Sequence, residues 1–411
     1  MQRQPILMGV AAVVVIVAAV VVVVLVTGDR EPTASQSPSP SATATQTVEP
    51  SASPSASDAP SESATPSQAA GPFDVAWEPV ELEPDADVSG VSFVGGKWFA
   101  VGQVFPEAAI WMSDDGRTWS RAEIASTREE NQVTAVTDVV ELDGQLVAIG
   151  AFGQMDSDQF AWMTWTSDDA GATWTERRDG PSPHALRAIV PAGPGLVAAG
   201  ADYTGTTPFD SWIAVSEDGL TWERTSAVFE STEIISMAVR EDRIVAVGIE
   251  FTDTGGSNPS IFSSDDGGAT WSAASIPAPS GPEAAFLYEV VATDDGFVAA
   301  GGGLGGASAW LSADGETWEQ IQIAESASAR GMALVDGGFV AVGNVMGHDI
   351  GPGHSWTSVD GRTWEVGTEF SPGTVMILAA DGDGPTVVAG GQCVIVSESC
   401  EAVLWIGQVT R

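Results

Sequence analysis

The chain is poor in positive charge. It contains 15 lysines and arginines against 56 aspartates and glutamates, Lys97 is its single lysine, and its formal net charge is −41. A polyanion of this size repels phosphate backbones and anionic lipid headgroups. Nucleic acid and anionic membrane surfaces are therefore poor partners, and a solvated acidic surface is the simplest interpretation of the composition.

Cysteine is nearly absent as well. Cys393 and Cys400 are the two cysteines of the chain, and neither lies near the N-terminus, which disfavours a lipid-anchored lipoprotein. Outside a cell, a pair at this spacing is expected to form a disulfide that closes a local loop, with two free thiols as the alternative. A metal site at this pair would need further ligands nearby, and the sequence offers none.

Charge is also missing from one long apolar run. No residue from Ile6 to Val26 is charged, which is enough helix to cross a bilayer. We expect a short cytoplasmic N-terminus (1–5), a transmembrane helix (6–27) that acts as a signal anchor, and the remaining chain outside the cell. A small-residue cleavage site is not apparent, so the uncleaved anchor is favoured over a cleaved signal peptide.

The segment that follows, residues 28–72, consists mostly of Ser, Ala, Pro, Thr and Gln. It has too few large apolar side chains to offset the entropy of ordering. The sequence therefore predicts a disordered linker that carries the folded part, residues 73–411, away from the membrane.

That folded part is repetitive. An Asp-rich phrase that ends in tryptophan occurs six times, with the tryptophans 46 to 55 residues apart. These spacings fall within, or just beyond, the range of about 20–50 residues that is typical of propeller and solenoid repeats. The copies span residues 113–119, 167–174, 216–222, 264–271, 312–318 and 358–364. A second landmark is a short apolar run that ends in glycine, and it occurs at Gly102, Gly150, Gly200, Gly248, Gly301, Gly343 and Gly390.

Each unit is an alternation of short β-branched or aromatic runs and Gly/Asx turns, which indicates four antiparallel strands. Four strands in about 45 residues are typical of a propeller blade. We predict an all-β, seven-bladed β-propeller with six Asp-box blades and a C-terminal blade. The segment around Trp77 is expected to dock beside the strand around Trp405 and complete that last blade, with Pro79 at the outer edge.

The phrase resembles the Asp-box, or bacterial neuraminidase, repeat Ser-x-Asp-x-Gly-x-Thr-Trp. The copies at residues 167–174 and 264–271 match it in full, and the other four lack the residue between Asp and Gly. In that family the box is a structural turn away from the catalytic face. The resemblance therefore implies a sialidase-like fold and a structural role for Asp115, Asp169, Asp218, Asp266, Asp314 and Asp360.

Sialidase chemistry itself is not expected. That class uses three arginines on the substrate carboxylate, a tyrosine nucleophile helped by a glutamate, and an aspartate. This chain has two tyrosines, Tyr203 and Tyr288, and no Arg-Ile-Pro stretch. Most of its arginines fall in Asp boxes, outer strands or strand ends, so the carboxylate clamp has no evident members.

The loops of the opposite face hold the candidate ligand residues. Acidic members are expected to be solvated, or else to act as paired carboxylates of a hydrolase; aromatic members would pack against loops or stack on a ligand. Two histidines and an aspartate at 348–354 are too few for a firm metal site. No cofactor is expected; calcium on the acidic loops stays open as an alternative, although no calcium-binding loop is present. The candidates are Phe152, Asp156, Asp158, Asp202, Tyr203, Phe209, Asp210, His348, Asp349 and His354.

The sequence thus predicts a monomeric, membrane-anchored, extracellular propeller that recognises a protein or a cell-wall glycan without catalysis. A glycoside hydrolase or exo-sialidase-like enzyme that uses loop carboxylates is the alternative. A third is an assembly factor, since Asp-box propellers also resemble chaperones of membrane complexes.

Overall fold

The computed structural model describes residues 72–411 except 127, 155–159, 179–183, 203–209, 254–255, 278–284, 304, 346–351, 372–374 and 394–401. The expected cytoplasmic segment, the transmembrane helix and the linker up to residue 71 lie outside this part of the chain. Within it, no helix is long and apolar enough to pass through a bilayer. The described residues fold entirely into strands and their connections.

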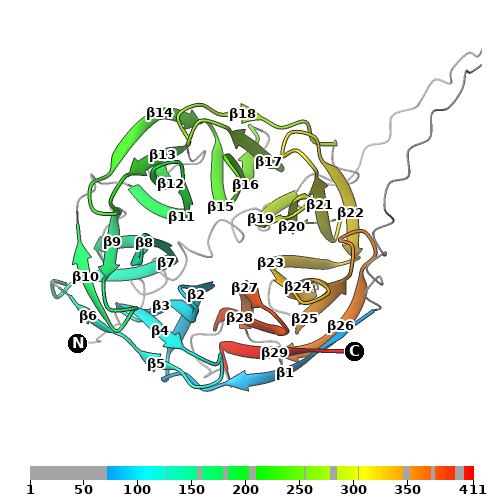
Figure 1. Ribbon diagram of the computed structural model, residues 1–411, viewed down its shortest axis with the longest axis horizontal. Coiled ribbons are helices and arrows are strands. Elements are labelled where there is room, and N and C mark those ends of the chain that lie inside the picture. The colour runs from blue at the N-terminus through cyan, green and yellow to red at the C-terminus, as the bar shows by residue number, and fades with distance from the viewer. Residues whose placement is uncertain are drawn as a thin grey trace, which may run out of the picture.

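The strands form blades around a central axis (Figure 1), which confirms the all-β propeller. Each blade is named here by its innermost strand. The β2 blade comprises β2 (Ala86–Val94), β3 (Lys97–Val104), β4 (Glu107–Ser113) and β5 (Ser120–Arg121). The β7 blade comprises β7 (Gln132–Leu142), β8 (Gln145–Gln154), β9 (Phe160–Ser167) and β10 (Thr173–Arg177), with β6 (Glu123–Ala125) added outside β10.

Two blades follow on the next arc of the ring. The β11 blade comprises β11 (His184–Ala192), β12 (Gly195–Asp202), β13 (Asp210–Ser216) and β14 (Glu223–Phe229). The β15 blade comprises β15 (Thr232–Arg240), β16 (Arg243–Phe251), β17 (Ser257–Ser264) and β18 (Ser272–Ala273). They share one eight-stranded sheet because Asp210 pairs with Thr232 where β13 meets β15.

The remaining blades return to the starting point. The β19 blade comprises β19 (Ala285–Thr293), β20 (Gly296–Gly303), β21 (Ala307–Ser312) and β22 (Glu319–Ala324). The β23 blade comprises β23 (Ala327–Val335), β24 (Gly338–Val345), β25 (Gly353–Ser358) and β26 (Glu365–Ser371). The β27 blade comprises β27 (Val375–Asp383), β28 (Thr386–Cys393), β29 (Leu404–Thr410) and, from the start of the folded part, β1 (Asp74–Val80).

β1 closes the ring. It pairs antiparallel with β29, with Trp77 opposite Gly407 and Pro79 opposite Trp405, which confirms the predicted splice. The Trp77 ring also stacks on Phe370 of the neighbouring blade at 4.5 Å. Pro79 lies in the outermost strand, where one side of the backbone is unpaired and the missing N–H is tolerated.

The landmark glycines are explained by a β-bulge in every innermost strand. The pairing register shifts at the same place in β2, β7, β11, β15, β19, β23 and β27. At these glycines other than Gly200 the bulge presses a carbonyl oxygen against the second strand, and a Cβ on Gly343 would lie only 1.8 Å from the Ser328 oxygen. At Gly200 a Cβ would instead meet the Trp212 ring at 2.4 Å. In the β27 blade the equivalent glycine is Gly391 rather than the expected Gly390, which pairs with Ala379.

The Asp boxes form the turns between third and fourth strands. In the first box, Asp115 Oδ1 accepts the amides of Arg117 and Thr118, both at 2.8 Å. The Trp119 indole donates to the Gly116 carbonyl at 2.8 Å. Hydrogen bonds from the box threonine and its neighbours lower the pKa of all six box carboxyls, because they stabilise the charged form.

Each box also packs on the preceding blade, which holds the ring together. Gly171 has a φ of +88°, and a Cβ there would meet the Phe99 ring at 2.5 Å. Phe99 in turn meets the Trp174 ring edge to face at 6.3 Å, and both side chains are almost fully buried. The apolar core of the propeller therefore lies between the blades, where Ala, Val and aromatic side chains of adjacent sheets interdigitate.

Candidate functional site

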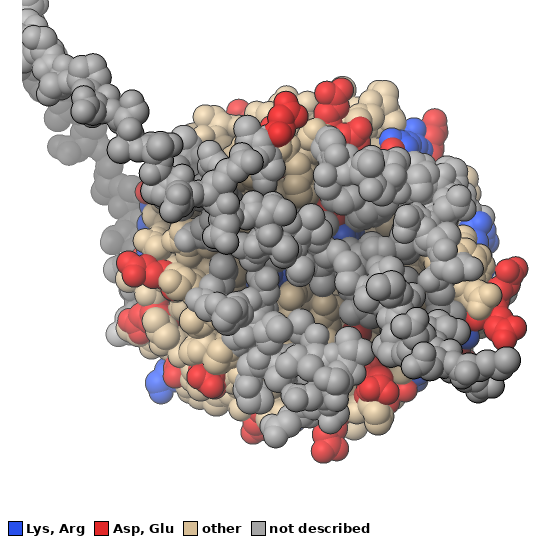
Figure 2. Space-filling model, turned by 180° about the vertical axis from the view of Figure 1, so that it is seen from behind, with Lys and Arg blue, Asp and Glu red and all other residues tan. Residues whose placement is uncertain are grey.

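Most of the sequence-predicted ligand residues fall in the undescribed stretches. Figure 2 shows the face opposite to that in Figure 1, where the described Asp and Glu side chains appear mainly along the outer rim. Phe152, Asp202, Asp210 and His354 are described, and they belong to three different blades. The candidates that lie outside the described residues are Asp156, Asp158, Tyr203, Phe209, His348 and Asp349.

The four described candidates have local contacts rather than a common site. Asp202 forms an ion pair with Arg224 at 3.4 Å, and Asp210 accepts the Ser231 amide at 2.8 Å. The Phe152 ring lies under the Arg178 guanidinium at 5.1 Å. His354 Nε2 lies 3.7 Å from Glu369 Oε2.

The structure tests the metal and disulfide predictions only in part, because some of the residues concerned lie outside its described stretches. Among the residues that the structure describes, no group of three or more His, Cys, Asp or Glu side chains is placed to hold a metal ion. Cys393 at the end of β28 is disulfide-bonded, and Cys400 lies outside the described residues. The specific pairing therefore stays a prediction.

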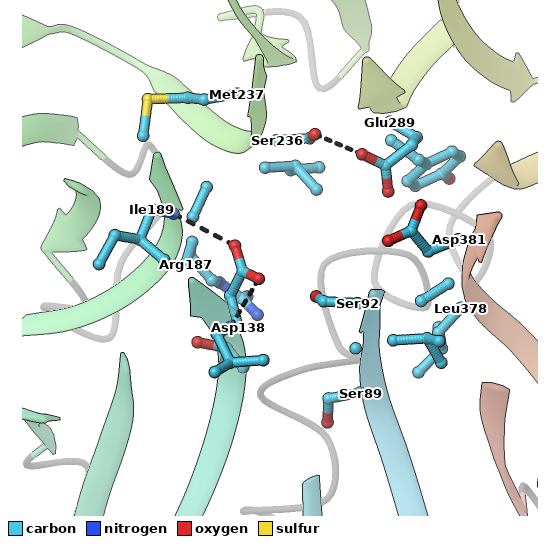
Figure 3. A pocket seen from close by; sticks show the side chains of 18 of the residues that line it. Ser89, Ser92, Asp138, Arg187, Ile189, Ser236, Met237, Glu289, Leu378 and Asp381 are labelled. Carbon is cyan, nitrogen blue, oxygen red and sulfur yellow. Dashed lines mark hydrogen bonds between the residues drawn. The ribbon is translucent and has the colours of Figure 1, made fainter. Parts of the chain in front are cut away.

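The site that the structure reveals is the central channel. A cavity of about 460 Å³ runs between the innermost strands of all the blades, and Figure 3 shows part of its lining. The bulge residue of each innermost strand lines it, so every blade contributes one side chain at the same level. These residues are Ser89, Thr137, Arg187, Ile235, Tyr288, Arg330 and Leu378.

Three carboxylates reach this channel and clasp neighbouring blades. Asp138 on β7 accepts the Ile189 amide of β11 at 3.2 Å. Asp381 on β27 accepts the Phe93 amide of β2 at 2.7 Å. Glu289 on β19 accepts the Ser236 hydroxyl of β15 at 2.6 Å. These bonds join blades at the axis of the ring, where no ladder pairing connects the innermost strands.

Their surroundings favour the neutral form of each carboxyl. Burial raises the pKa of Asp138 to about 7, that of Glu289 to about 8 and that of Asp381 to about 6. Charge repulsion between the carboxyls raises two of these pKa values further. The carboxylate of Asp381 raises the pKa of Asp138 and of Glu289, and that of Asp138 also raises the pKa of Glu289. Figure 3 shows the carboxyl groups of Glu289 and Asp381 pointing toward one another, with Asp138 across the channel.

Two arginines oppose these acids. Arg187 Nη2 donates to Glu233 Oε1 at 2.7 Å; the Glu233 side chain is buried and that of Arg187 is 12% exposed. Arg330 is only 7% exposed and lies over the Tyr288 ring, with its guanidinium carbon 4.8 Å from the ring centre. Within the described part of the chain, Arg330 makes no hydrogen bond and no ion pair. A guanidinium carries five N–H donors, so this side chain presents unused donors to the channel.

Sequence reasoning missed these residues because it assigned most arginines to Asp boxes, outer strands and strand ends. A signal was nonetheless present. The bulge residue precedes the structurally equivalent glycine by 13 residues in every unit, as in Arg187 to Gly200 and Arg330 to Gly343. Units aligned on that glycine would have placed both arginines and Tyr288 in one ring.

Comparison with known proteins bears on the fold. No protein-family model matches this sequence, and no curated protein matches it. A solved structure of YCF48 bound to D1 peptide is similar, with a TM-score of 0.54 at 16% identity over 82% of this chain and 96% of that one. This likeness and the Asp-box geometry together confirm a sialidase-like β-propeller.

Two further solved structures are similar at lower scores. A Trypanosoma rangeli sialidase matches with a TM-score of 0.49 at 13% identity over 79% of this chain, and the chain spans only 55% of its length. A protein of unknown function from Dyadobacter fermentans matches with a TM-score of 0.47 at 14% identity, over 69% of this chain and 96% of that one.

Proposed function

We propose that the chain is a seven-bladed propeller that recognises its ligand at the central channel without catalysis. The observation that carries the proposal is Arg330, a buried guanidinium that lines the cavity and has no acceptor among the described residues. Burial of an unpaired charge is costly. A site that keeps an unpaired guanidinium is suited to a ligand that supplies the hydrogen-bond acceptor.

The ligand class that fits best is a peptide segment with an anionic group. YCF48, a propeller of the same fold, is seen bound to D1 peptide, which supports a peptide as the ligand of this chain too. The Tyr288 ring beneath Arg330 adds an apolar surface that a peptide side chain can cover. An acidic cell-wall glycan carries the same chemistry, and it is one outcome of the test below.

The setting of the module follows from the sequence. We propose a single transmembrane helix at 6–27 with the N-terminus in the cytoplasm, a linker at 28–72, and a monomeric propeller outside the cell. The uncharged run from Ile6 to Val26 supports the anchor. The net charge of −41 supports solubility of the propeller and argues against nucleic acid as a partner.

The test is a screen of the full chain, immobilised, against a random peptide library and an array of acidic and neutral glycans. We expect saturable binding that is lost in Arg330→Gln. Arg362→Gln is the matched control, because Arg362 is an exposed Asp-box arginine paired with Glu319. Ligands that bind Arg330→Gln as tightly as the unchanged protein would show that the channel is not the recognition site.

A hydrolase is the second candidate, and one observation favours it. Glu289 and Asp381 face one another in a cavity, and their pKa values are raised to about 8 and about 6. Carboxyls with raised pKa values are typical of general acids. Both, however, are held by hydrogen bonds that clasp the ring. Turnover of chromogenic glycosides that disappears in Glu289→Gln would favour the enzyme over the recognition module.

A further inference from the structure

We propose that the channel binds the anionic group of its ligand at Arg330 together with protons on Asp138, Glu289 and Asp381, so that ligand capture is coupled to proton uptake. The proposal rests on the recognition function above and specifies how that same site is regulated. It is carried by the geometry of one cavity, which holds three carboxyl groups from different blades and a guanidinium with no acceptor among the residues that the structure describes.

Arg330 is the group that receives the anion. It is more than nine-tenths buried, lines the cavity, lies over the Tyr288 ring, and has no acceptor in the described part of the chain. Arg187 is less suited to this role because Glu233 already accepts from it at 2.7 Å. A carboxylate or sulfate can take two parallel hydrogen bonds from one guanidinium, which favours an oxyanion over a halide at Arg330.

The other charged groups around the cavity decide the sign of the coupling. The β2 lining contributes only uncharged side chains, such as Ser89 and Ser92. Besides Arg330 and Tyr288, the titratable and charged groups that line the cavity are Asp138, Glu141, Arg187, Glu233, Glu289 and Asp381. Asp383, at the end of β27, acts on Asp381 from outside the cavity. Arg187 and Glu233 offset one another, and Glu141 adds one more carboxyl to the lining. Burial raises the pKa of the three clasping carboxyls, so they set how the charge that a bound anion meets changes with pH.

Those three carboxyls lose their protons between mildly acidic and mildly alkaline pH. Burial raises their pKa values to about 7, about 8 and about 6. Charge repulsion raises them further, from Asp381 on Asp138, from Asp138 and Asp381 on Glu289, and from Asp383 on Asp381. A negative charge about 10 Å from a bound anion, at an effective dielectric constant of about 20, weakens binding roughly tenfold. The anion therefore binds best when the carboxyls are neutral, and its arrival draws protons onto them.

The hydrogen bonds of these three carboxyls do not prevent them from gaining and losing protons. Asp138 and Asp381 each accept the amide of the neighbouring blade on one oxygen and the amide of the next residue on the other. A neutral carboxyl keeps a carbonyl oxygen for the bond between blades, and its hydroxyl oxygen still has a lone pair for the local amide. Glu289 accepts from Ser236 through Oε1. None of the clasps requires a negative charge, so the ring can stay closed while the charge in the channel changes.

The experiment is calorimetric titration of the full chain with acetyl-trialanine that has a free carboxylate, at pH 5.5, 7.0 and 8.5. The same peptide with a C-terminal amide is the uncharged control. At pH 7.0 the titration is repeated in two buffers with different ionisation enthalpies, which counts the protons taken up. Thermal melts at each pH show whether the fold is intact.

We expect the carboxylate peptide to bind at least about tenfold more weakly at pH 8.5 than at pH 5.5, with net proton uptake at pH 7.0. Arg330→Gln should abolish binding, while Arg362→Gln should not change it. The double variant Glu289→Gln with Asp381→Asn should retain binding but lose most of the pH dependence. It therefore tests the coupling even where Arg330→Gln fails to fold.

Three results would overturn the proposal. They are equal binding of the amide-capped peptide, affinity for the carboxylate that does not change with pH, and no saturable heat at any pH. If a screened ligand depends on Arg330 but binds without proton uptake, the recognition function stands and the coupling alone is wrong. If neither the screen nor the probe shows dependence on Arg330, both proposals fail together.

Discussion

Glu289 offers a quantitative check of the channel, because its carboxyl should make the whole propeller less stable as the pH rises. Its pKa lies at about 8 in the folded protein, against an ordinary value of 4.5. Between these two values the folded state holds a proton that the unfolded state has released. Stability from this group is therefore complete below about pH 4.5 and is lost as the pH rises to 8.

The size of the effect follows from the same pKa values. A carboxyl displaced from 4.5 to about 8 makes ionisation in the folded protein costlier by at most about 5 kcal/mol. The side chain lines a cavity that water can enter, which reduces the loss to about 2–3 kcal/mol. The Glu289→Gln variant has no carboxyl proton to lose at this position, so its unfolding free energy should lack this fall with rising pH.

The assay is urea unfolding of the unchanged protein and of Glu289→Gln between pH 4.5 and 8.5. The gap in unfolding free energy between them should change by about 2–3 kcal/mol across that range, with the unchanged protein losing more. Glu365→Gln, an exposed position on β26, is the control and should run parallel to the unchanged protein. If Glu289→Gln also runs parallel, Glu289 is not buried in the way the channel geometry requires.

The remaining predictions concern the frame of the propeller and are read from thermal melts. Gly343→Ala places a Cβ 1.8 Å from a carbonyl oxygen and should cost about 3 kcal/mol or more, while Gly305→Ala, with nothing within 4 Å, should be neutral. Trp77→Ala removes the stack that seats β1 on the neighbouring blade and should cost about 3 kcal/mol; an unchanged melt would contradict the ring closure. Asp314→Ala deletes two hydrogen bonds of 2.9 Å within its Asp box and should lower the melting temperature more than Glu316→Ala in the same turn.

The fold could be predicted from the sequence because the residues that determine it lie close together in the chain and recur from unit to unit. The box Asp, Gly and Trp make their bonds within three or four residues of each other, as Asp169 does with Thr173. A turn of this kind needs the same residues wherever it occurs. The closure by β1 was predictable for a different reason, since the last unit lacked a fourth strand and the segment around Trp77 matched one.

The channel was harder to predict because its residues carry no local signature. Arg330 and Tyr288 sit in ordinary strand sequence, and each points inward only because a bulge shifts the register beside it. The alternation of inward and outward side chains changes at a bulge. Periodicity that is read along a single strand therefore assigns such positions to the wrong face. The fixed distance of 13 residues to the bulge-facing glycine becomes meaningful only once the bulge is known.

The acidic composition and an anion site at Arg330 do not contradict one another. Charges separated by more than about 8 Å of physiological salt solution are largely screened. The described Asp and Glu side chains on the rim in Figure 2 therefore contribute little to the field inside the channel. There the balance is set by Arg187, Arg330, Glu141, Glu233 and three carboxyls that burial holds toward neutrality. A net charge of −41 thus repels polyanions that would cover a broad surface, while a single anionic group can still enter the axis of the ring.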